Sequence, residues 1–99
     1  MAVGEITRYG RPLDKVRENM MERARDNRNP FDFTVYEEIE AIFDGLTSLD
    51  RDTWAEAFAA PAPRYEAQAE AAEGAGNVAE ARQLWLRAYG YYRVARYRR

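Results

Sequence analysis

The strongest structural signal in the chain lies near its end, where residues 77–97 read NVAEARQLWLRAYGYYRVARY. Projected at about 100° per residue, the apolar residues of this stretch define one stripe of a long helix over 78–97. The members of the stripe are Ala81, Leu84, Trp85, Ala88, Tyr92 and Ala95. Asn77 and Glu80 stand in the N-x-x-E register of a helix cap, which predicts where this helix starts.

Two further helices are expected in the first half of the chain. Pro12 suits a first helical position, and turn residues before Pro30 end this helix near Arg28. Residues 34–37 read T-x-x-E, the register of a capping box. They predict a second helix, for which Gly45 is a C-terminal cap.

The middle of the chain predicts two more helices. The first starts at Ser48 or Asp50, and the prolines at 61 and 63 break or kink it because each removes a backbone donor. The second covers 64–73 and ends at the glycines of 74–76. No alternating β-branched run indicates a strand. We therefore predict an all-α fold, a small bundle of four to five helices ending in a TPR-like helical hairpin, although a true array needs about three such repeats.

Length and composition limit what the chain can do. Ninety-nine residues make one domain, which we place at 12–97 between an N-terminal arm (1–11) and a basic tail (98–99). Cysteine and histidine are both absent, so no Ser-His-Asp triad, thiolate nucleophile or zinc site can form. A chain without cysteine suits a reducing compartment, and we expect a cytoplasmic location. No apolar run approaches the roughly 20 residues of a membrane span.

Other chemistry also lacks its signature. Residues 26–32 fail as a calcium loop, since arginine and proline occupy ligand positions. The glutamates at 66, 70 and 73 share one helix face, which we interpret as solvated or paired with arginines. We expect no catalytic residue, no cofactor and no metal in this chain alone.

Charge is unevenly distributed. Net charge is −2, yet all seventeen acids lie at or before Glu80 and six of the fifteen basic residues follow it. Such asymmetry can mark a nucleic-acid surface, or a basic helix packed on acidic helices of the same domain. Arg82 and Arg93 fall on one flank of the last helix and Arg87 and Arg98 on the other. They form no continuous phosphate track, so we do not expect nucleic acid as the partner.

The last helix has more apolar surface than a small bundle needs. Tyr91 lies at one edge of the stripe, and Leu86 and Tyr89 extend the other edge, so apolar groups span over half the circumference. One interpretation is a second interface with something outside the chain. The other is that Tyr and Arg cover the stripe while their polar ends reach water. The candidate interface or substrate-route residues are Trp85, Arg87, Tyr89, Tyr91, Tyr92 and Arg93.

The segment 65–97 also carries a family pattern. An Ala-rich helix, a glycine turn and a helix reading A…W-L-R-A-Y-G-Y-Y-R-V-A resemble the N-terminal helical cap of a group of α/β hydrolases. That group includes 2,6-dihydroxypseudooxynicotine hydrolase, the fermentation-respiration switch protein and fungal polyketide-shortening hydrolases. Trp85 stands where the family often has tyrosine. The resemblance is good over 65–97, loose over 34–60 and absent before that.

The resemblance implies a function for the chain. Family members hydrolyse carbon–carbon or ester bonds, and their cap helices cover the active site and help admit the substrate. We therefore expect a catalytically inert cap or lid whose partner is an α/β hydrolase catalytic domain. With its second apolar surface bare, the chain is expected to form a two-fold homodimer through the last helix. The alternative functions are a small TPR-like protein-interaction module and a basic-helix nucleic-acid binder.

Overall fold

The computed structural model describes residues 13–97, which contain five helices and no strand. The helices are α1 (Leu13–Arg25), α2 (Tyr36–Gly45), α3 (Arg51–Ala59), α4 (Ala62–Gly74) and α5 (Val78–Ala95). The predicted all-α bundle is therefore confirmed. Pro12, the arm at 1–11 and the tail at 98–99 lie outside the described residues.

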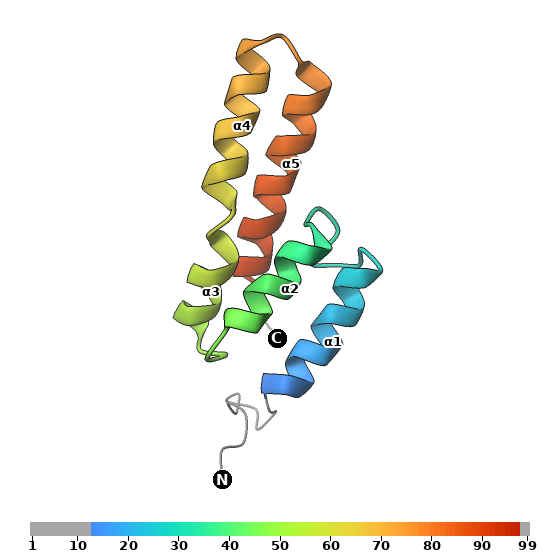
Figure 1. Ribbon diagram of the computed structural model, residues 1–99, viewed down its shortest axis with the longest axis vertical. Coiled ribbons are helices and arrows are strands. Elements are labelled where there is room, and N and C mark those ends of the chain that lie inside the picture. Colours follow the sequence, from blue (N-terminus) through green and yellow to red (C-terminus); the bar gives the residue numbers. More distant parts are fainter. Residues whose placement is uncertain (1–12, 98–99) are drawn as a thin grey trace.

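The helices form a long hairpin with a smaller helical layer beside its lower half (Figure 1). α4 and α5 run antiparallel and make the most extensive helix pair. α3 continues below α4 and packs on α5, while α1 packs on α2. The upper half of the hairpin projects beyond α1, α2 and α3 (Figure 1). Among residues 13–97, this half of α4 and α5 therefore has its extensive helix contacts only within the hairpin.

The core lies where α2, α3 and the end of α5 meet. Phe43, Trp54 and Phe58 form an aromatic cluster with ring centroids 4.4 to 5.8 Å apart. The buried Trp54 indole N–H donates to the backbone carbonyl of Val94 at 2.8 Å, which satisfies the one polar group of that side chain. Aromatic pairs of this kind each contribute about 0.5–1.5 kcal/mol beyond the area they bury.

Of two predicted helix starts, that of α3 agrees with the structure and that of α2 differs from it. Asp50, one of the two candidates for starting α3, accepts the backbone N–H groups of Asp52 and Thr53. The capping box at residues 34–37 does not form, because the N-cap of α2 is Val35 and it makes no side-chain cap. The Thr34 hydroxyl instead donates to the Phe31 carbonyl at 2.9 Å, which closes the preceding turn.

The ends of α1 and α4 share one motif. Asn27 and Gly76 have positive φ, 54° and 81°, and each follows its helix by two residues. The next N–H groups, of Arg28 and Asn77, donate back to Arg23 and Ala72 at 2.9 and 2.8 Å. This is the Schellman arrangement, which satisfies the last carbonyls of a helix. It ends α1 three residues before the predicted Arg28 and leaves Asn77 as an N-cap without a side-chain hydrogen bond.

The prolines divide α3 from α4 without reversing the chain. Ala60 and Pro61 both keep right-handed helical backbone angles, so the two helices meet in a bend. α4 begins at Ala62, two residues before the predicted start, because Pro63 is tolerated in the first turn, where its missing N–H has no helical acceptor. α5 ends at Ala95 rather than residue 97.

Gly90 marks a close approach between α5 and the loop before α2. It is buried in the middle of α5, and a Cβ atom added there would lie 2.8 Å from the Phe33 Cβ. That neighbouring atom is attached directly to the backbone, so the loop itself would have to move. Glycine is therefore required here by packing.

We expect Gly90→Ala to lower the free energy of unfolding by about 1–3 kcal/mol. The clash outweighs the roughly 1 kcal/mol that alanine gains in a helix. Gly74→Ala is the matched control, since no atom lies within 4 Å of its added Cβ. Urea unfolding followed by circular dichroism measures both. Equal stability of the two variants would contradict the close packing of Phe33 on α5.

Candidate functional site

The six candidate residues of α5 do not share one face. Tyr91 is completely buried, although the sequence pattern placed it at the edge of the apolar stripe. Trp85, Arg87, Tyr92 and Arg93 are half-buried, and Tyr89 is 48% exposed. The difference arises because the lower half of α5 is covered from two directions, by α3 and α4 on one side and by the loop before α2 on the other.

Tyr91 belongs to a polar junction that joins α2 to the hairpin. Its hydroxyl donates to Glu38 and accepts the backbone N–H of Val35 at 3.2 Å. The Tyr65 hydroxyl donates to the same carboxylate at 2.7 Å, and the Tyr65 and Tyr91 rings stack with centroids 5.8 Å apart. Arg64 binds the Glu38 carboxylate at 2.6 Å. We call Glu38, Tyr65, Tyr91 and Arg64 the Glu38 junction.

Electrostatics identify the junction as a structural clamp. Burial raises the pKa of Tyr91 strongly, and the hydrogen bond to Glu38 raises it further. Burial alone would also raise the pKa of Glu38, but hydrogen bonds from Tyr91, Tyr65 and Arg64 outweigh it and lower the pKa. At neutral pH the phenols are therefore neutral donors and Glu38 is an ionised acceptor. Neither tyrosine provides a nucleophile.

Three other candidates are also engaged inside the chain. The Tyr92 hydroxyl donates to Glu66 of α4 at 2.9 Å. Arg93 forms an ion pair with Asp32 at 3.0 Å, and the Arg87 guanidinium lies 5.5 Å from the centroid of the Tyr65 ring. These contacts match one sequence-based interpretation, in which part of the basic helix packs on acidic groups of the same domain.

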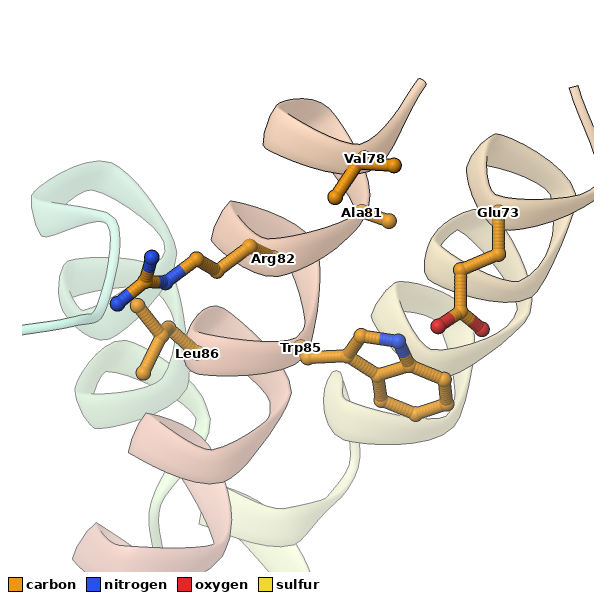
Figure 2. Close-up of a pocket in the computed structure, with 6 residues that line it drawn as sticks. All are labelled: Glu73, Val78, Ala81, Arg82, Trp85 and Leu86. Atoms are coloured by element: carbon orange, nitrogen blue, oxygen red, sulfur yellow. The ribbon is translucent and has the colours of Figure 1, made fainter. Parts of the chain in front are cut away.

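The upper half of the hairpin carries an open groove of about 540 Å³. Its lining residues are Glu73, Val78, Ala81, Arg82, Trp85 and Leu86. Figure 2 shows the Trp85 ring reaching toward α4, with the Glu73 carboxylate beside it, while the Arg82 and Leu86 side chains point away from α4. Val78 is 74% exposed and Leu86 is 38% exposed. We call this surface the hairpin groove.

A second apolar surface lies one turn further along α5. The Phe33 and Tyr89 rings lie 6.2 Å apart at a tilt of 59°. The Arg93–Asp32 ion pair borders both rings, because Asp32 precedes Phe33 in the chain and Arg93 lies one helical turn after Tyr89. We call Phe33 and Tyr89 the aromatic ledge. Sequence periodicity identified Tyr89 but not Phe33, which lies in a loop and has no helical pattern to mark it.

Searches for a metal site, a membrane span and a related protein each return no candidate for the described residues. Within 13–97, no group of three or more acidic side chains is placed to hold a metal ion. None of the helices in this range combines the length and apolar character that crossing a bilayer requires. Comparisons with protein-family models, curated proteins and solved structures give no match for this chain. The hairpin groove and the aromatic ledge are the two outward surfaces of α5.

The Glu38 junction predicts how stability varies with pH. The pKa of Glu38 in the folded chain lies below the ordinary value of about 4.3. The ionised carboxylate therefore contributes fully to the free energy of unfolding above that pH, and this contribution is lost as the pH falls below it. Glu38→Gln should cost about 1–3 kcal/mol at neutral pH, and the cost should shrink near pH 3. Urea unfolding at the two pH values measures it.

Glu40→Gln provides the control for this measurement. It makes the same change of charge in α2 at an exposed position for which no hydrogen bond is present among the described residues. We expect little effect at either pH. A cost of Glu38→Gln that stays constant with pH would show that the ionised carboxylate contributes nothing to the junction.

Proposed function

We propose that this chain is a catalytically inert helical cap that covers the active site of an α/β hydrolase catalytic domain and associates with a second copy. The observation that carries the proposal is the exposed aromatic surface of α5. Tyr91 and Tyr92 are engaged within the chain, yet Tyr89 remains 48% exposed. It lies in segment 65–97, which resembles the cap helices of these hydrolases.

The aromatic ledge is the surface that we assign to the catalytic domain. The ledge joins the exposed Tyr89 ring to the half-buried Phe33 ring, and polar side chains border both. Aromatic rings with such a border have the composition of an interface core with its rim. Phe33 comes from the loop before α2 and Tyr89 from α5, so docking there would hold both parts of the cap against the catalytic domain. A cap in this position would exclude water from the active site and limit substrate entry.

The parent reaction follows from the same resemblance. It is hydrolysis of a carbon–carbon or ester bond, carried out entirely by residues of the catalytic domain. The cap contributes no general acid, base or nucleophile. The absence of cysteine supports a reducing compartment, and we propose a cytoplasmic location.

A domain exchange tests this function. The full chain replaces the helical cap of a hydrolase from the 2,6-dihydroxypseudooxynicotine hydrolase group, and kcat and KM are measured on that enzyme's own substrate. We expect the chimera to hydrolyse that substrate. Tyr89→Ser should lower kcat/KM by about tenfold, because it removes a central aromatic contact.

Gln83→Ser is the matched control, since Gln83 is exposed on the same helix but outside the ledge. It should leave kcat/KM within about twofold. A chimera that is folded by circular dichroism but has no turnover would contradict the proposal. Equal effects of Tyr89→Ser and Gln83→Ser would contradict the role of the ledge and favour a general protein-interaction module.

A further inference from the structure

We propose that the hairpin groove binds the hairpin of a second copy of this chain, about a two-fold axis parallel to α4 and α5. In this arrangement α4 of each copy packs against α5 of the other. Glu73 then lies opposite Arg82 of the partner subunit, and Trp85 lies in the seam between them. The pairing specifies the self-association proposed above and does not depend on docking to a hydrolase.

The first observation is the apolar seam along the exposed side of α5. Val78 and Trp85 are its apolar members, and Arg82 between them completes spacings of four and three. This is the alternation by which one helix packs its side chains between those of a parallel or antiparallel neighbour. No other helix of residues 13–97 lies beside this half of the hairpin (Figure 1).

The second observation is that the two edges of the groove carry opposite charge. Glu73 lines the groove from α4, whereas Arg82 lines it from α5. Glu66, Glu70 and Glu73 recur at spacings of four and three and so lie on one side of α4. That side borders the groove, since Glu73 lines it and Glu66 accepts from Tyr92 of α5.

The charges on these edges are available to a partner. Within residues 13–97, neither Glu73 nor Arg82 takes part in an ion pair or a side-chain hydrogen bond. Figure 2 shows them on opposite sides of the groove, with Trp85 and Val78 between them. An acidic edge, an apolar middle and a basic edge make a surface that can complement itself.

Charge selects the direction of the two-fold axis. An axis parallel to the helices exchanges the two edges, so each acidic edge faces the basic edge of the partner subunit. A two-fold axis that lies in the plane of the interface but perpendicular to the helices would place the acidic edge of one copy against the acidic edge of the other, which is unfavourable. The parallel axis therefore pairs unlike charges twice, once on each side of the apolar seam.

The test is the association state of the full chain by sedimentation equilibrium over a wide range of concentration. We expect a monomer–dimer equilibrium for the natural chain. Arg82→Glu and Glu73→Arg should each raise the dissociation constant by about tenfold or more, because each places like charges opposite one another. The double variant E73R/R82E should return the dissociation constant close to its natural value.

Arg51→Glu is the matched control, because it makes the same charge reversal at an exposed position of α3, away from the groove. It should leave dimerisation unchanged. A natural chain that stays monomeric throughout overturns the proposal. So does an E73R/R82E variant as weak as the single variants when circular dichroism shows all of them folded. Neither result alters the outcome of the domain exchange, which uses no dimer.

Discussion

The Glu38 carboxylate is the contact on which the arrangement of this molecule depends. It accepts hydrogen bonds from the hydroxyls of Tyr65 and Tyr91 and from the guanidinium of Arg64, and so connects α2 with both helices of the hairpin. A buried phenol without a partner would cost about 1–3 kcal/mol. Tyr91 therefore stays in the interior only while Glu38 is present to accept its hydrogen bond.

The junction also determines which side of α5 faces outward. With Tyr91 and Val94 completely buried, the helix cannot rotate without exposing them. Val78, Arg82 and Tyr89 are then held on the opposite side, where the hairpin groove and the aromatic ledge form. The position of this outward surface is thus a consequence of a buried contact, the hydrogen bond from Tyr91 to Glu38, whose two residues are 53 positions apart in the chain.

Local sequence signals were sufficient where the structure depends on local chemistry. The five helices follow from apolar periodicity, and the cap at Asp50 and the turn at Gly76 follow from side-chain and backbone preferences within a few residues. The capping box at Thr34 was wrong because the N-cap of α2 is Val35, one residue later, so Thr34 lies outside the helix and its hydroxyl donates to the Phe31 carbonyl. A register of residue types does not fix the first residue of a helix to one position.

The sites were only partly predictable for a physical reason. Periodicity identified Trp85 and Tyr89 as candidates, but it assigned one buried stripe to a helix that is covered from two directions. It therefore put Tyr91 at an edge and omitted Val94. Glu38 gave no signal at all, since an acidic residue in an amphipathic helix is ordinarily solvated. Its partners lie 26 to 53 residues away, beyond any local pattern.

A double-mutant cycle between Glu38 and Tyr91 tests the central contact most directly. Glu38→Gln, Tyr91→Phe and the combined variant would be unfolded in urea at neutral pH. We predict a coupling free energy of about 1–3 kcal/mol, because removing either group already breaks the shared hydrogen bond. Additive effects of the two substitutions would contradict the account and leave the outward orientation of α5 without its cause.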